Sequence, residues 1–121
     1  MKDREIIKPV IWIGTSRKDL KSFPRQVMRE IGLALYAAQC GEKDPAAKPM
    51  HGFKPKVMEI VAPLDSETYR AVYTVKLGNN VFVLHAFQKK AKKGRTTPRK
   101  ELDLIRLRLK EAIEIYTVRQ N

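Results

Sequence analysis

Two neighbouring strand-like segments, residues 69–76 and 81–87, constrain the fold more than any other feature of the sequence. Both are rich in β-branched and aromatic residues, and residues 78–80 between them read Gly-Asn-Asn, which is a typical turn composition. Strands joined by so short a connection pair as an antiparallel hairpin. The sequence therefore predicts a β-hairpin as part of a sheet.

The register of this hairpin decides which side chains meet. A two-residue turn at residues 79–80 places Arg70 opposite Lys89 and Thr74 opposite His85, and a turn one residue earlier keeps the same pairing of even with odd positions. Because side chains alternate across a strand, the apolar sets then face the helices and the open face carries Arg70, His85 and Lys89. Opposed cations cost about a few tenths of a kcal/mol, so a bridging anion is one reason for this arrangement. Ordinary solvated sheet residues are the alternative.

The remaining segments give both helix and strand signals. Apolar residues recur at helical spacing in segment 24–41, at Val27, Ile31, Ala34, Leu35 and Ala38. The expected order is a strand at 10–13, helices at 16–23 and 24–41, a loop at 42–56, a strand at 57–62 that Pro63 ends, the hairpin, and a helix at 97–116. This order predicts a single α+β domain, residues 1–121, with a small antiparallel or mixed sheet of about four strands and helices packed on one face.

The charge of the chain indicates the class of partner. There are 25 Lys and Arg residues against 13 Asp and Glu, which gives a formal net charge of +12. Residues 88–100 supply seven of these positive charges and contain no acidic residue. Each cation that neutralises a phosphate gains from counterion release, so nucleic acid is the expected partner.

Several classes of protein are excluded on composition. No apolar run has the length of a membrane span and the first residues do not resemble a signal peptide, so we expect a cytoplasmic protein with no membrane partner. One Cys and two distant His cannot supply a closed tetrahedral metal site, and no Asp/Glu cluster suits two-metal chemistry. We therefore expect neither a metal nor another cofactor.

Several motifs together resemble the phage-related, HigB-like branch of the RelE/ParE toxin superfamily. Their order and spacing extend over roughly residues 8 to 116. The matching segments are Ile11-Trp12-Ile13-Gly14, Lys18 to Pro24, Lys48 to Phe53, Tyr69 to Tyr73, Val83 to Lys90, Thr97-Pro98 and Ile105 to Arg108.

The resemblance implies a toxin of a type II toxin–antitoxin system that acts as a ribosome-dependent mRNA endoribonuclease. It implies a helix-turn-helix antitoxin of the HigA kind as inhibitory partner, mRNA on the ribosome as substrate, and contact with operator DNA only through the antitoxin. It also implies the family's microbial ribonuclease-like α+β fold, which agrees with the order of elements above.

Metal-free RNA cleavage needs a base for the 2′-hydroxyl, a cation for the phosphate in the transition state, and an acid for the leaving 5′-oxygen. Arg70 is the candidate for the phosphate, because a guanidinium grips two oxygens and keeps its charge. Lys89 and Lys90 are candidates for the proton transfers or for plain electrostatic binding. His85 is either a catalytic base or a structural histidine within its strand.

Other basic residues are candidates for RNA binding. The strand before Tyr69-Arg70 reads Glu59-Ile60-Val61 where relatives carry basic residues, so Lys54 and Lys56 are the candidate substitutes, and Glu59 is interpreted as the partner of a neighbouring cation. A docking surface for ribosomal RNA or for an acidic antitoxin is expected at Lys92, Lys93, Arg95, Arg99 and Lys100.

Two alternatives share the fold or the charge. One is a ParE-like toxin that inhibits DNA gyrase and cleaves no RNA. The other is a non-toxic phage protein that only binds nucleic acid.

Overall fold

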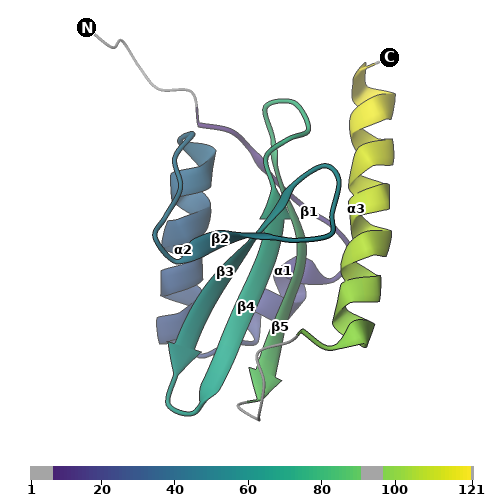
Figure 1. Ribbon diagram of the computed structural model, residues 1–121. Coiled ribbons are helices and arrows are strands. Elements are labelled where there is room, and N and C mark those ends of the chain that lie inside the picture. The colour runs from purple at the N-terminus through teal and green to yellow at the C-terminus, as the bar shows by residue number, and fades with distance from the viewer. Residues whose placement is uncertain (1–6, 91–96, 121) are drawn as a thin grey trace, which may run out of the picture.

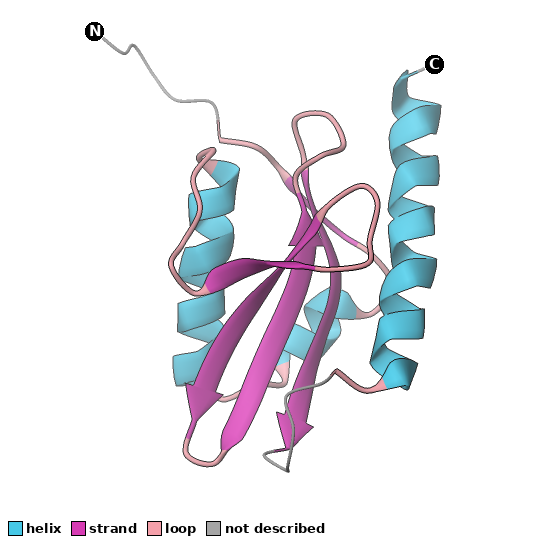
Figure 2. Ribbon diagram, in the orientation of Figure 1, coloured by secondary structure: helices cyan, strands magenta, loops and turns pink. Residues whose placement is uncertain are grey.

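The computed structural model describes residues 7–90 and 97–120, which form one twisted sheet with helices around it (Figures 1 and 2). The elements are β1 (Val10–Trp12), α1 (Ser16–Lys21), α2 (Arg25–Gln39), β2 (Ala47–Met50), β3 (Val57–Leu64), β4 (Glu67–Thr74), β5 (Val81–Lys90) and α3 (Arg99–Gln120). The strand order in the sheet is β1-β5-β4-β3-β2. β1 runs parallel to β5, whereas the other neighbours are antiparallel.

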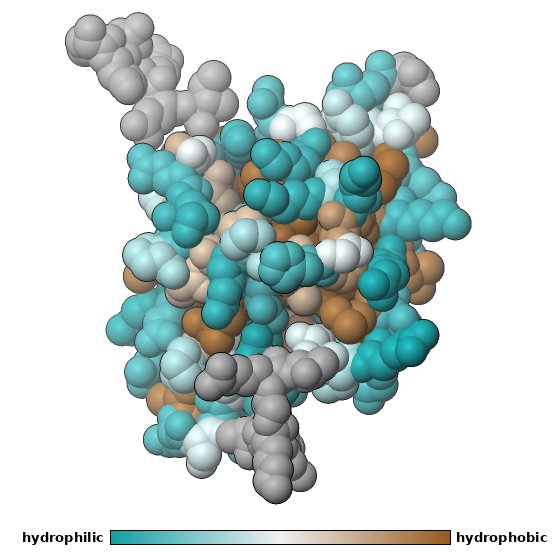
Figure 3. Space-filling model, in the orientation of Figure 1, coloured by the Kyte–Doolittle hydropathy of each residue, from teal (hydrophilic) through white to brown (hydrophobic). Residues whose placement is uncertain are grey.

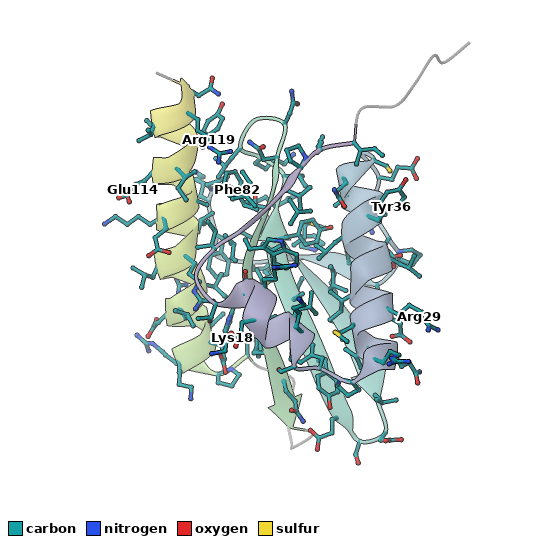
Figure 4. All side chains as sticks on the ribbon, turned by 180° about the vertical axis from the view of Figure 1, so that it is seen from behind. Lys18, Arg29, Tyr36, Phe82, Glu114 and Arg119 are labelled. Carbon is teal, nitrogen blue, oxygen red and sulfur yellow. The ribbon has the colours of Figure 1, made fainter. Side chains whose placement is uncertain are left out.

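The sheet is apolar on both faces, and a different helix layer covers each. One buried cluster joins the predicted α2 stripe, including Val27 and Ile31, to Tyr73 and Val83 of the sheet. The second cluster joins Leu109 and its apolar neighbours on α3 to the opposite side of the same strands. Figure 4 shows α1 and α2 in front of the sheet and α3 beside it. The α+β class is thus confirmed, although α3 packs on the face that was expected to be open.

The fifth strand, β2, lies within the segment that was expected to be a loop. It is four residues long, contains Pro49, and pairs with β3 from Ala47 opposite Ile60 to Met50 opposite Val57. A proline is tolerated there because β2 is an edge strand with one neighbour. So short a strand, with no alternation of apolar and polar residues, leaves no recognisable signal in the sequence.

β3 continues through Pro63 to Leu64, so the prediction that Pro63 ends the strand is wrong. The N–H of Val61 donates to the carbonyl of Ala46, which shows that this position points its amide toward the β2 side. Pro63, two residues further on, has its nitrogen on the same side but beyond the end of β2. No ladder hydrogen bond is lost there, and the strand extends to the predicted polar turn, where Asp65 has φ of 58°.

The prediction of a two-residue turn between β4 and β5 is also wrong, because residues 75–80 form a longer connection. The side chain of Leu77 in this connection packs against α3. Arg70 lies opposite Phe87 rather than Lys89, and His85 lies opposite Val72 rather than Thr74.

A bulge explains part of this shift in register. Tyr73 pairs with Val83 while Val72 pairs with His85, so Leu84 is an extra residue without a partner on β4. Below the bulge, even positions still pair with odd positions. Arg70, His85 and Lys89 therefore share one face of the sheet, as the alternation predicted.

Candidate functional site

Arg70 of β4 and Glu59 of β3 form an ion pair. It lies on the face of the sheet opposite α1 and α2. Arg70 Nη1 donates to Glu59 Oε2 at 2.9 Å, and the two side chains are only 14% and 9% exposed. The residues come from neighbouring strands, with Val61 directly opposite Arg70. The interpretation of Glu59 as the partner of a cation is confirmed. Such a contact holds the guanidinium in a fixed orientation, because a charge-assisted hydrogen bond is stronger than a neutral one.

Lys89 lies next to this pair. Its Nζ and the Nε of Arg70 are both buried, and neither finds a hydrogen-bond acceptor in the part of the chain that the structure describes. Burial lowers the pKa of Lys89, the positive charge of Arg70 lowers it further, and the carboxylate of Glu59 partly opposes both effects.

Buried donors without acceptors are rare, because each costs about 1–3 kcal/mol. Two cations and one carboxylate leave this cluster with a net positive charge and with two donor nitrogen atoms that have no acceptor among the described residues. Its chemistry suits an anion with several acceptor oxygens, and a phosphate group fits this description. A lysine with a lowered pKa can also give up its proton more readily than an exposed lysine.

His85 lies away from solvent beneath the start of α3. Its Nε2 is 2.6 Å from Glu101 Oε1, its Nδ1 is 3.4 Å from Arg108 Nη1, and its ring stacks on Phe87 at 4.9 Å. An arginine can only donate, so Nδ1 is the acceptor and Nε2 carries the hydrogen that is donated to Glu101. With 5% of its surface exposed, His85 has the environment of the structural histidine that the sequence left as an alternative.

Arg108 links several segments of this region by hydrogen bonds. It was not identified as a functional candidate from the sequence. It is 8% exposed and donates to the carbonyl of Leu84 at 3.1 Å and to Thr15 Oγ1 at 2.9 Å. Gly14 makes room for it: a Cβ at Gly14, where φ is +57°, would lie 2.7 Å from Arg108 Nε. The available signal was its position on the apolar stripe of α3, between Ile105 and Leu109.

Of the other predicted basic residues, four have side chains that the structure describes, and these four lie at different places on the fold. Lys54 and Lys56 are both exposed, but they line different hollows, Lys54 beside α3 and Lys56 near the end of α2. Arg99 and Lys100 are exposed in the first turn of α3. Lys90 is the last residue of β5. Three further candidates lie outside the described residues: Lys92, Lys93 and Arg95.

Two absences are noted for residues 7–90 and 97–120, the part of the chain that the structure describes. In these residues, no three His, Cys, Asp or Glu side chains are grouped so that they could hold a metal ion. None of the helices there combines the length and the apolar character that crossing a membrane requires.

The fold and the site together define a small α+β protein with two cations and one carboxylate clustered on neighbouring strands β3, β4 and β5. The chain belongs to the family described as phage derived protein Gp49-like, whose profile matches residues 18–110. This family is of the RelE and HigB toxin type, so the predicted membership of the toxin superfamily is confirmed and the chain is a toxin-type protein.

One similar solved structure is the toxin–antitoxin complex RelBE2 from Mycobacterium tuberculosis. The likeness covers 75% of this chain and 100% of that chain, with 17% sequence identity and a TM-score of 0.48. No curated protein matches the sequence.

Proposed function

We propose that this protein is the toxin of a type II toxin–antitoxin system and cleaves mRNA on the ribosome without a metal ion. The observation that carries the proposal is the cluster of Arg70, Glu59 and Lys89, in which two buried nitrogen atoms have no acceptor among the described residues. Membership of the Gp49-like family and the motif resemblance support the same reading.

In the proposed reaction, the 2′-oxygen of the RNA attacks the neighbouring phosphorus as its proton is removed. A 2′,3′-cyclic phosphate forms, the bond from phosphorus to the 5′-oxygen breaks, and the leaving oxygen takes up a proton. Arg70 stabilises the extra negative charge on the phosphate, since Glu59 already orients its guanidinium. Lys89 supplies the proton to the 5′-oxygen, and its lowered pKa suits this task. Lys90 and His85 stay predictions for the other proton transfer.

The test of this proposal is the variant Arg70→Lys. A lysine keeps the positive charge that the buried carboxylate of Glu59 needs, but it lacks the planar fork that grips two phosphate oxygens. We expect cleavage to fall by about 100-fold or more, the range for losing a transition-state donor. Arg29→Lys is the matched control, because Arg29 is exposed on α2 behind the sheet (Figure 4).

The measurement is the mapping of RNA ends after brief induction. The proposal requires in-frame cuts within translated codons, with 2′,3′-cyclic phosphate termini that disappear in Arg70→Lys and persist in Arg29→Lys. Growth arrest with intact messages contradicts it and favours a ParE-like inhibitor of gyrase. Harmless expression of the chain alone favours a phage protein that only binds nucleic acid.

The proposal includes a partner and a compartment. The resemblance implies a helix-turn-helix antitoxin of the HigA kind, which would bring operator DNA into the complex, and action on ribosomes places the toxin in the cytoplasm. The +12 charge of the chain suits an acidic partner. Co-expression with a helix-turn-helix protein encoded next to this one should restore growth, and the two chains should co-purify. Failure of every such neighbour to bind would contradict this part of the proposal.

A further inference from the structure

A basic hollow separate from the Arg70 cluster lies between the connection from β2 to β3 and the middle of α3. It has a volume of about 240 Å³ and is lined by three cations and an aromatic ring: Lys54, Arg106, Lys110 and Phe53. Its apolar floor includes Leu109, and no acidic residue lines it. This hollow plays no part in the reaction proposed above.

The aromatic ring and one of the cations form a cation–π contact. The guanidinium of Arg106 lies over the ring of Phe53, 5.1 Å from its centroid, while Nη1 is 3.9 Å from the carboxylate of Asp103. Arg106 remains largely exposed, with 53% of its side chain accessible. A flat cation on a flat ring offers a surface on which a nucleobase stacks, and this mode of binding tolerates any base.

The hollow and the Arg70 cluster lie on the same face of the sheet. Phe53 and Leu109 pack into the apolar cluster that also contains Val72 and Phe87. Phe87 is the cross-strand neighbour of Arg70, and Val72 follows Arg70 on the same side of β4. Figure 3 shows apolar surface between hydrophilic side chains along the boundary of this face with α3. Both sites therefore lie on the side of the sheet on which α3 packs.

We propose that the hollow is a second nucleotide subsite for the same RNA strand, a proposal that rests on the function proposed above. A base stacks against Phe53 and Arg106, and its phosphate is held by Lys54 and Lys110. An acidic peptide would use the three positive charges but would leave the stacked ring without a role, so the combination of ring and cations favours a nucleotide.

The test uses the full-length protein and single-stranded oligoribonucleotides with 2′-O-methyl groups, which cannot be cleaved, from a dinucleotide to about an octanucleotide. Fluorescence anisotropy at fixed salt measures each affinity. We expect the affinity of the wild type to rise by about tenfold at the length that reaches the hollow. Phe53→Leu, which keeps the apolar packing, and Lys54→Met should lose this rise and bind the shortest oligonucleotide normally. Lys18→Met, an exposed lysine on α1 behind the sheet, is the control.

Two results overturn the subsite. One is that Phe53→Leu, Lys54→Met and the wild type bind oligonucleotides of every length with equal affinity. The other is that binding of an acidic peptide depends on Phe53 while binding of RNA does not. Lys54 is exposed, so its replacement keeps the test valid even where Phe53→Leu folds poorly. The two proposals fail separately. A length-dependent rise that Phe53→Leu abolishes, without any cut message, supports the subsite and contradicts the nuclease. Cut messages without a length-dependent rise in affinity support the nuclease and contradict the subsite.

Discussion

The substitution Arg108→Met should lower the free energy of unfolding more than a substitution of any exposed residue on the same helix. Arg108 joins α3 to two distant parts of the chain, the Thr15 hydroxyl before α1 and the carbonyl of Leu84 in the β5 bulge. Methionine keeps most of the apolar stem of the side chain but donates no hydrogen bond. The substitution therefore isolates the polar contacts from the packing.

The magnitude follows from the geometry of these contacts. Two bonds, at 2.9 and 3.1 Å, come from a buried charged donor, and each contributes about 1.5 kcal/mol, the lower end for a charged group. The contact with His85 at 3.4 Å is long and adds little. We expect the free energy of unfolding to fall by about 3 kcal/mol, which lowers Tm by about 10 °C for a chain of this size.

Urea denaturation followed by circular dichroism measures the free energy, and a thermal melt measures Tm. Arg119→Met is the matched control, since Arg119 is exposed near the end of α3, and its change should stay within about 0.5 kcal/mol. A loss below about 1 kcal/mol for Arg108→Met would refute the reasoning, because the cost of burying the guanidinium would then cancel its hydrogen bonds.

Three further predictions concern the site and the turns. Lys89→Met should raise stability at pH 7 by about 1 kcal/mol, because an unpartnered buried donor is removed. The lowered pKa of Lys89 shows that the folded state disfavours the charged lysine. The stability of the wild type relative to Lys89→Met should therefore recover as the pH rises from that lowered pKa to about 10.5. A difference in urea midpoints between the two proteins that does not narrow over this range contradicts the prediction. Glu59→Gln should cost about 2 kcal/mol by leaving Arg70 without its counter-charge, and a double-mutant cycle with Arg70→Met should give a coupling of at least about 1 kcal/mol rather than additive losses. Gly78→Ala should lower stability by about 2 kcal/mol, since φ at Gly78 is +67° and the new Cβ would lie 2.8 Å from a tyrosine ring of α3. Gly32→Ala in α2 should raise stability by about 0.5 kcal/mol, because the new Cβ would meet nothing within 4 Å. Changes in Tm of the same sign for both variants would disprove the contrast.

The parts of the fold that depend on periodicity could be predicted from the sequence. The spacing of Val27 and Ile31 identified the buried side of α2. The alternation of β4 and β5 placed Arg70 and Lys89 on one face even though the register was wrong, because a shift by two positions preserves the face. The interpretation of Glu59 as the partner of a neighbouring cation was also correct.

The parts that depend on tertiary contacts could not be predicted. The bulge at Leu84 and the six-residue connection from β4 to β5 are stabilised by packing against α3, which no local pattern encodes. For the same reason the burial of Lys89 Nζ was not foreseeable, and Arg108 was interpreted only as part of a motif. His85 was expected on an open face, and α3 covers it.

The parallel pairing of β1 with β5 has a consequence for biosynthesis. Among the described strands, β5 is the one neighbour of β1, and some seventy residues separate the two in the chain. β1 therefore enters the sheet only after β5 has been synthesised, and the hydrogen bond from Arg108 to Thr15 requires the still later synthesis of α3. The face that carries Arg70 is complete only when β5 and α3 have left the ribosome, so the nuclease activity proposed above requires synthesis of nearly all the described residues.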